Sequence, residues 1–215
     1  MKPLIITGTD TGIGKTVVAA MLTLALDGSY WKPIQSGTKD GTDAQRLAAL
    51  TGLPAGRIVP ERYVLSEPVS PHRAAELDGT RIELAALALP RIPRENWLII
   101  EGAGGVLVPL NRAVLQIDMF VRWGAPVVVV ARTSLGTINH TLLTLEALRR
   151  RDIDVLGLVF VGDSVPDSER TITEFSSVKR LGRLPLLARL DANSLREAFA
   201  ANFDRADFEL AYARQ

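Results

Sequence analysis

Short apolar runs alternate along the chain with longer segments whose apolar positions recur at helical spacing. The runs predict buried strands at 3–7, 30–33, 97–101, 126–131 and 154–161, and a last short strand or turn at 182–186. The longer segments predict helices at 15–27, 43–51, 81–90, 114–123, 138–151 and 166–181. Asp43 is expected to cap the second helix, and Asn193 or Ser194 a C-terminal one. The proline- and charge-rich stretch 53–80 is expected to be irregular.

The predicted strands show almost no alternation of apolar and polar positions, which is typical of a parallel sheet covered on both faces. The repeated order of strand and helix predicts one doubly wound α/β domain over residues 1–215, with a mainly parallel sheet and helices on both faces. Ligands of such sheets bind at the carboxyl ends of the strands. The candidate chemistry is therefore expected in the loops that follow the strands.

The most specific motif is the loop between the first strand and the first helix, GTDTGIGKT at 8–16. Its glycines let the backbone approach phosphates, while backbone N–H groups and the helix N-terminus face the anion. Lys15 is expected to reach the β- and γ-phosphate oxygens, and the Thr16 hydroxyl to ligate magnesium. The spacing departs from the usual phosphate loop, because Thr9 stands where a first glycine is expected and Gly8 lies one position earlier.

A second lysine and two carboxylates follow other strands. Lys32 ends the second strand and is held by Pro33, so we expect it to point to the same edge as the phosphate loop. Asp43 precedes a helix, and Glu101 ends a very apolar strand, where a carboxylate needs a cation partner. Magnesium prefers hard oxygen ligands, so Thr16, Asp43 and Glu101 form the expected metal set. From the residues alone, a solvated lysine and an ordinary helix cap remain alternatives.

A further loop, 134–140, follows the strand at 126–131 and presents Gly136 and Thr137 at the start of a helix. Such an end can bind an anion. The alternative is a loop with a helix cap and a histidine satisfied by its surroundings.

The amino-acid composition excludes several kinds of catalytic and metal site. The chain has no cysteine, which excludes disulfides, thiol nucleophiles and iron–sulfur clusters, and its two histidines are too few for a three-histidine zinc site. The net charge of +1 is too balanced for nucleic-acid binding, and Arg149, Arg150 and Arg151 are interpreted as cations at a helix C-terminus. No run approaches the ~18 apolar residues of a membrane helix. We expect a cytoplasmic protein without membrane or nucleic-acid partners.

Taken together, the motifs resemble the dethiobiotin synthetase family over residues 4–190. GTDTGIGKT, YWKPIQSG at 30–37, TDA at 42–44, EGAGG at 101–105, LGTINH at 135–140 and GRLP at 182–185 occur in the family's order. The resemblance implies a phosphate-loop NTPase fold and an ATP-dependent cyclo-ligase of biotin biosynthesis. Its substrates are 7,8-diaminononanoate, CO2 or bicarbonate, and a magnesium nucleoside triphosphate; its products are the cyclic urea dethiobiotin, ADP and phosphate. It also implies a homodimer whose substrate site is shared between subunits.

The resemblance further implies roles for individual residues. Lys32 and Lys15 are the catalytic lysines, and Thr16, Asp43 and Glu101 hold Mg2+. The implied nucleotide site comprises Gly12, Ile13, Gly14, Lys15, Thr16, Val17, Asp43, Glu101, Gly102, Ala103, Gly104, Val161, Gly162, Pro185, Leu186 and Leu187. The implied substrate site comprises Thr11, Ser36, Gly136, Thr137, Ile138 and Asn139.

Two positions depart from a common family pattern. Many members have glutamate where this chain has Gly12, although others have glycine. Many members carry an asparagine after the strand at 154–161, where it reads adenine, and Val161 takes that place here. We therefore expect loose selection of the base, so that ATP or another nucleoside triphosphate serves. Two other functions are alternatives. A cobyrinate-type amide synthetase usually carries a glutaminase domain with a cysteine nucleophile, and a partition-type ATPase carries a signature lysine where this chain has Asp10.

Overall fold

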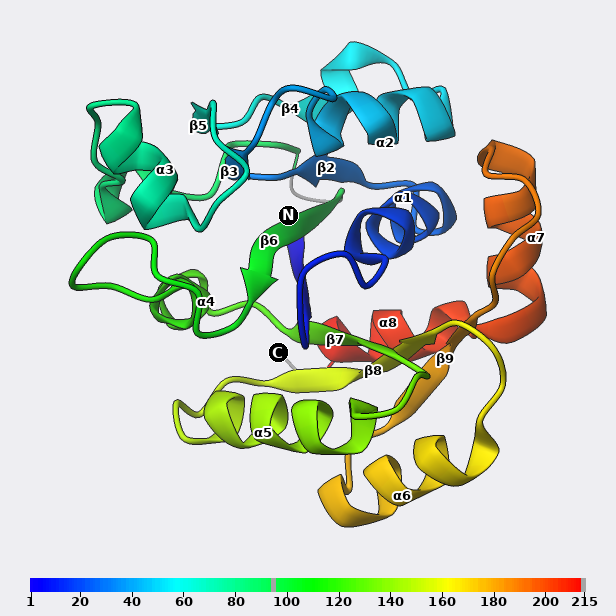
Figure 1. The fold of residues 1–215 in the computed structure, drawn as a ribbon. Helices are drawn as coiled ribbons and strands as arrows, with labels where there is room; N and C mark the ends of the chain where they lie inside the picture. Colours follow the sequence, from blue (N-terminus) through cyan, green and yellow to red (C-terminus); the bar gives the residue numbers. More distant parts are fainter. Residues whose placement is uncertain (94–95, 214–215) are drawn as a thin grey trace.

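A central sheet of seven strands forms the middle of the structure, a computed structural model that describes residues 1–93 and 96–213 (Figure 1). Its order is β4-β2-β6-β1-β7-β8-β9. The strands are β1 (Lys2–Gly8), β2 (Ser29–Trp31), β4 (Ile58–Val59), β6 (Trp97–Gly105), β7 (Val127–Arg132), β8 (Val155–Val161) and β9 (Arg180–Leu184). Neighbouring strands run parallel, so their carboxyl ends share one edge. A small parallel sheet joins β3 (Ile34–Ser36) to β5 (Tyr63–Leu65).

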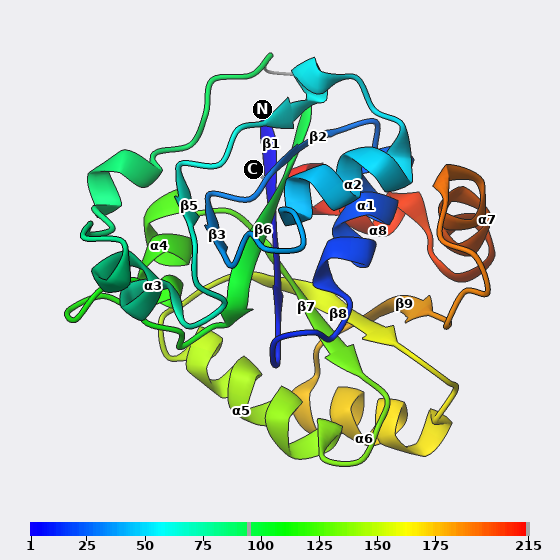
Figure 2. The same ribbon diagram turned by 45° about the horizontal axis from the view of Figure 1, so that its top comes forward.

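Helices cover both faces of the central sheet, as Figures 1 and 2 show. One layer contains α1 (Lys15–Ala25), α2 (Asp43–Thr51), α7 (Ala192–Asn202) and α8 (Arg205–Ala213). The other contains α4 (Gln116–Trp123), α5 (Thr137–Arg149) and α6 (Pro166–Ser176), while α3 (Pro71–Leu77) packs on the small sheet. Successive side chains of a strand point to opposite faces, so Leu4 and Ile6 enter the first core and Ile5 the second. The predicted doubly wound α/β fold is confirmed.

Several predicted elements differ from the observed ones. The stretch 53–80 is not irregular throughout, because it contains β4, β5, α3 and a 3-10 turn at Ala55–Arg57. These strands of two or three residues are too short to show a period. The predicted helix at 81–90 is only a 3-10 turn at Leu84–Leu87. The predicted helix at 166–181 ends at Ser176, because Ser177 takes a left-handed φ of 54° and the chain then enters β9.

The caps of two helices also differ. Thr42, and not Asp43, caps α2: its hydroxyl accepts from the Gln45 backbone N–H at 3.2 Å. The Gln45 side chain accepts in return from the Thr42 backbone N–H at 2.9 Å. Asp43 is therefore the first residue of the helix, and its carboxylate is free for other partners. Asp191, one residue before α7, caps that helix by accepting from the Ser194 backbone N–H at 2.9 Å.

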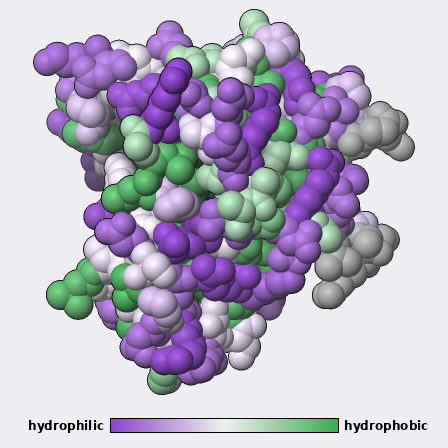
Figure 3. All heavy atoms as spheres, turned by 90° about the vertical axis from the view of Figure 1, so that its right-hand side faces the viewer, coloured by the Kyte–Doolittle hydropathy of each residue, from purple (hydrophilic) through white to green (hydrophobic). Residues whose placement is uncertain are grey.

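The three arginines at 149–151 lie at the C-terminal end of α5, as the sequence predicted. Arg149 ends α5 and donates to the Ser176 carbonyl, while Arg150 pairs with Glu146 and Arg151 with Asp118. The face seen in Figure 3 is mainly hydrophilic, with small hydrophobic areas between polar residues. Across the described ranges, every helix is too short or too polar to cross a membrane.

Candidate active site

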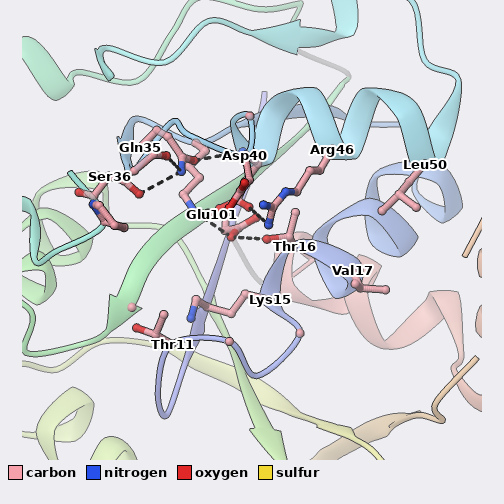
Figure 4. A pocket seen from close by; sticks show the side chains of 18 of the residues that line it. Thr11, Lys15, Thr16, Val17, Gln35, Ser36, Asp40, Arg46, Leu50 and Glu101 are labelled. Atoms are coloured by element: carbon pink, nitrogen blue, oxygen red, sulfur yellow. Dashed lines mark hydrogen bonds and ion pairs between the residues drawn. The ribbon is translucent and has the colours of Figure 1, made fainter. Parts of the chain in front are cut away.

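A cavity of about 750 Å³ opens where the loop after β1, the segment after β2 and the carboxyl end of β6 meet (Figure 4). This is the edge formed by the carboxyl ends of the strands, where the sequence predicted the functional residues. Eleven of the predicted residues line the cavity: Thr11, Gly12, Gly14, Lys15, Thr16, Val17, Lys32, Ser36, Asp43, Glu101 and Gly104. In Figure 4, Thr11 and Lys15 lie across the cavity from Gln35 and Ser36, and the Thr16 side chain points toward Glu101.

The phosphate loop is curled around its own lysine. Gly12 and Gly14 have φ values of 69° and 98°, a left-handed region that favours glycine, and Gly14 leads directly into α1. Lys15 is only 6% exposed, and its ammonium donates to the Asp10 carbonyl at 2.6 Å. Burial lowers the pKa of Lys15 to about 8, although Glu101 attracts the charged form. A phosphate group that replaced the Asp10 carbonyl would give the Lys15 ammonium a negatively charged hydrogen-bond partner.

Lys32 lies in a cluster of charges and is only 6% exposed, which excludes the alternative of a solvated lysine. Its ammonium bonds to the Asp43 carboxylate and to Glu101 Oε1, the latter at 3.2 Å. Burial alone would lower the pKa of Lys32, but the two carboxylates outweigh burial and raise it above its ordinary value. Lys32 is therefore a charged group at the inner end of the cavity.

The same cluster has the donors that a hard cation needs. The Thr16 hydroxyl donates to Glu101 Oε1 at 2.9 Å, and the Lys32 ammonium reaches both Glu101 and Asp43. One positive charge already lies between the two carboxylates, so they are close enough to share a cation. The donor set of one hydroxyl and two carboxylates is all oxygen, as magnesium prefers. These residues could hold Mg2+.

Glu101 has a further partner that the sequence did not indicate. The Tyr30 hydroxyl donates to Glu101 Oε2 at 2.8 Å from the core between the sheet and α1. Burial, followed by the charge of Glu101, raises the pKa of the Tyr30 phenol well above its ordinary value. The phenol therefore keeps its proton and remains a donor.

Ser36 and the glycines after Glu101 border the cavity. The Ser36 hydroxyl is buried and lacks a hydrogen-bond partner within residues 1–93 and 96–213. A buried unpaired hydroxyl is costly, so this group is available to a ligand. The Gln116 side chain holds the glycine-rich end of β6 in place: it accepts from the Ala103 N–H at 2.6 Å and donates to the Gly105 carbonyl at 3.2 Å.

The other predicted site residues lie elsewhere. Ile13 belongs to the core, Gly102 lies beneath the Gln116 side chain, and Ala103 is tied to that same side chain. The Val161 side chain packs on the phosphate loop, with its Cγ1 3.1 Å from where a Cβ of Gly14 would lie. Gly162 donates to the Leu184 carbonyl at 3.0 Å. Pro185, Leu186 and Leu187 follow β9, and Gly136, Thr137, Ile138 and Asn139 form the start of α5. These residues do not line the described cavity.

Sequence reasoning missed part of the lining. Arg46 lies one helical turn after Asp43, with its guanidinium 3.8 Å from that carboxylate, and helical spacing could have identified it. Leu50 follows on the same helix, whereas Leu190 comes from the loop before α7 and has no local signal. The missed lining residues are Gln35, Gly37, Lys39, Asp40, Gly41, Arg46, Ala49, Leu50, Pro68 and Leu190.

Comparison with known proteins identifies the family. A family model described as an AAA domain matches residues 2–194. A protein of Rhodopseudomonas palustris (strain HaA2), named ATP-dependent dethiobiotin synthetase BioD, is 58% identical over 207 residues, which cover 96% of either chain. The chain belongs to the dethiobiotin synthetase family. A relative of the same name from Novosphingobium aromaticivorans is 53% identical over 97% of this chain and 100% of its own. The family resemblance predicted from the motifs is confirmed.

Solved structures agree with the fold of a dethiobiotin synthetase family member. A ParA family ATPase from Chlorobium tepidum superposes with a TM-score of 0.52 at 11% identity, covering 98% of this chain and 97% of that one. The septum site-determining protein MinD from Pyrococcus horikoshii, complexed with Mg-ADP, gives 0.54 at 14% identity, covering 92% and 86%. At these identities the likeness establishes the fold and not the activity.

Proposed function

We propose that this chain is the dethiobiotin synthetase of a biotin pathway, an ATP-dependent cyclo-ligase that forms C–N bonds. It converts 7,8-diaminononanoate, CO2 and a nucleoside triphosphate to dethiobiotin, ADP and phosphate when the nucleotide is ATP. The observation that carries the proposal is the position of Lys32, a buried charged lysine in the same cavity as the phosphate loop. Relatives of that name are 53–59% identical over nearly the whole chain.

The proposed reaction has two steps. One amine of the substrate takes up CO2 as a carbamate, whose oxygen attacks the γ-phosphorus while the bond to the β-phosphate oxygen breaks. The second amine then attacks the carbamoyl carbon, closes the five-membered ring and expels phosphate, and both amines lose protons. Mg2+ bound by Thr16, Asp43 and Glu101 would supply neutralising charge to the phosphate oxygens.

The chain's own groups stabilise charge and fix geometry in this scheme. Lys15 holds the β- and γ-phosphate oxygens, and Lys32 stabilises the negative charge that grows on the transferred phosphoryl group. Thr11 and the unpaired Ser36 hydroxyl hold the diamine in a bent form. Ring closure is intramolecular, so a correctly bent chain removes much of the entropic barrier. A histidine general base is not needed.

The decisive experiment measures phosphate release with each substrate omitted in turn. Release should depend strictly on both 7,8-diaminononanoate and bicarbonate, and the organic product should be the cyclic urea. Phosphate release without the diamine, or release stimulated by DNA, would instead favour a partition-type ATPase. That alternative is not favoured, because Asp10 stands in place of the signature lysine of that class. A cobyrinate-type synthetase is not favoured either, because the sequence has no cysteine for a glutaminase.

The proposal includes a homodimer with a shared substrate site. Gly136, Thr137, Ile138 and Asn139 begin α5 outside the described cavity, and the first turn of a helix leaves backbone N–H groups without intrahelical partners. The Thr137 N–H donates to the Ser134 carbonyl at 3.2 Å, and the other three would face a neighbouring molecule. Leu135 is fully exposed and Leu143 is 56% exposed on the same segment, which supports a covered surface there. The helix N-terminus would bind the carboxylate of a substrate held in the partner's cavity.

Subunit mixing tests the shared site. Lys32→Ala and Gly136→Phe should each inactivate the homodimer. After the two proteins exchange subunits, half of the dimers are mixed and one of their two sites has both native parts, so activity should recover to about a quarter of wild type. No recovery despite exchange shown by native mass spectrometry would indicate that each site is built from one chain.

The proposed location of the protein is the cytoplasm, and the proposed organisation is a single domain. The triphosphate substrate is supplied inside the cell, which supports a cytoplasmic location. The seven-stranded sheet is shared by both large cores, which supports treating the chain as one domain. Val161, Gly162 and Pro185–Leu187 remain the proposed surroundings of the base, next to the phosphate loop that Val161 contacts.

A further inference from the structure

We propose that Tyr30 is a positioning residue that fixes the orientation of Glu101, so that Glu101 presents one oxygen to the metal and keeps the other out of the metal site. This inference rests on the proposed magnesium site of the preceding subsection. It concerns a residue that binds neither substrate nor metal and acts through a carboxylate.

The two oxygens of Glu101 have different partners. Oε1 accepts from the Thr16 hydroxyl at 2.9 Å and from the Lys32 ammonium at 3.2 Å, on the cavity side. Oε2 accepts from the Tyr30 hydroxyl at 2.8 Å, on the side of the core between the sheet and α1. Tyr30 is 0% exposed and Glu101 is 1% exposed, so bulk water cannot replace the phenol. The carboxylate is therefore held at both ends, with a defined oxygen directed to each side.

The register of the sheet explains why Tyr30 reaches Glu101. β2 and β6 are parallel, with Tyr30 opposite Ile99 and Trp31 opposite Ile100. Because side chains alternate along a strand, Tyr30 and Lys32 share the face toward α1, and Glu101 lies on that face of β6. Tyr30 of β2 and Lys32, the residue that follows this strand, thus contact a single carboxylate on the neighbouring strand β6. The Tyr30 phenol approaches Glu101 from the core, and the Lys32 ammonium approaches it from the cavity.

The phenol has a chemical consequence for metal binding. A carboxylate free to rotate can offer either oxygen or both, whereas one whose second oxygen is hydrogen-bonded offers a single oxygen in a fixed plane. Partners that orient a metal-binding group affect affinity by about 10- to 100-fold when removed. Lys32 must also turn from Glu101 toward a phosphoryl group during the reaction, and Tyr30 then remains to hold the carboxylate.

The test is Tyr30→Phe, which removes the hydroxyl and keeps the ring. Mn2+ serves as the probe, titrated by electron paramagnetic resonance into protein with a non-hydrolysable nucleotide. We expect Mn2+ to bind about 10- to 100-fold more weakly than in wild type, while metal-free nucleotide binding changes less than twofold. The Mg2+ concentration for half-maximal turnover should rise in parallel. Tyr212→Phe is the matched control, because its phenol bonds to the Pro3 carbonyl away from the cavity.

The double variant separates positioning from a general effect on folding. If Tyr30 acts through Glu101, Tyr30→Phe with Glu101→Gln should bind Mn2+ no more weakly than Glu101→Gln alone. Additive losses, or an equal loss of metal-free nucleotide binding, would overturn the inference. So would Mn2+ affinity within twofold of wild type in Tyr30→Phe while Glu101→Gln binds weakly. If Glu101→Gln also binds Mn2+ normally, the proposed metal site itself fails, and the inference falls with it.

Discussion

Nucleotide binding should be accompanied by uptake of a proton at Lys15. In the structure this ammonium is buried, its polar partner is the Asp10 carbonyl, and its pKa is lowered to about 8. A triphosphate would bring several negative charges into hydrogen-bond reach. The charged form of Lys15 is then favoured, so the pKa rises in the complex, and any Lys15 that was neutral takes up a proton.

The size and sign of the effect follow from that pKa. At pH 8.5 a lysine with a pKa of about 8 is about one quarter charged, so binding should take up about 0.75 proton per nucleotide. The bound state has the higher pKa, so affinity is complete well below pH 8, is halved at about pH 8 and falls further as the pH rises. The fall approaches tenfold per pH unit, or about 1.4 kcal/mol, until the pKa of the complex is reached.

Isothermal titration calorimetry measures this uptake directly. The magnesium nucleotide is titrated at pH 8.5 in two buffers of different ionisation enthalpy, and the difference in observed heat gives the number of protons. The same titrations at pH 7 are the control, because Lys15 is then mostly charged and uptake should fall to about 0.1 proton. Uptake below about 0.2 proton at pH 8.5 would refute the reasoning, since it would mean that Lys15 is already charged in the free protein.

Three further predictions concern single substitutions. Lys32→Ala should lower turnover more than tenfold, a loss above ~1.4 kcal/mol, with nucleotide binding largely kept; a kcat above a tenth of wild type would remove Lys32 from catalysis. CTP, GTP or UTP should serve within about tenfold of ATP in kcat/KM, and Val161→Asn should shift preference to ATP; a hundredfold wild-type preference for ATP would contradict this. Gly104→Ala should lower the free energy of unfolding in urea by about 1–3 kcal/mol, because its φ is 68° and a Cβ would meet Val108 at 2.9 Å. Gly56→Ala, where a Cβ meets open space, is the control, and equal stability of the two variants would count against the argument.

The sequence predicted those site residues that lie at the carboxyl end of a strand or directly after it. The phosphate loop, Lys32 and Glu101 each follow an apolar run, and parallel strands bring such positions to one edge. The bond between Tyr30 and Glu101 joins residues 71 positions apart and depends on strand register, which a single sequence does not reveal. Leu190, from the loop before α7, lines the same cavity as Leu50 of α2, a tertiary contact that no local pattern in the sequence marks.

The errors in the fold have similar causes. The stretch 53–80 was predicted to be irregular because β4 has two residues and β5 three, and their strand character comes from pairing with β2 and β3. The predicted helix at 166–181 ran too far because the left-handed backbone at Ser177, which ends α6, has no glycine to mark it. The Asp43 cap was a smaller error, since Thr42 precedes it and both residue types are good caps.

The central place of β1 in the sheet affects the order in which the protein can fold. Residues 2–8 are synthesised before their partners on either side, which are β6, at 97–105, and β7, at 127–132. At about 5–20 residues per second, the first strand waits several seconds for either neighbour. The phosphate loop follows β1 directly, so it cannot take its final shape until β7, which ends at residue 132, has been synthesised. Nascent chains halted before β7 should therefore be unable to bind nucleotide, although they contain the whole phosphate-loop motif.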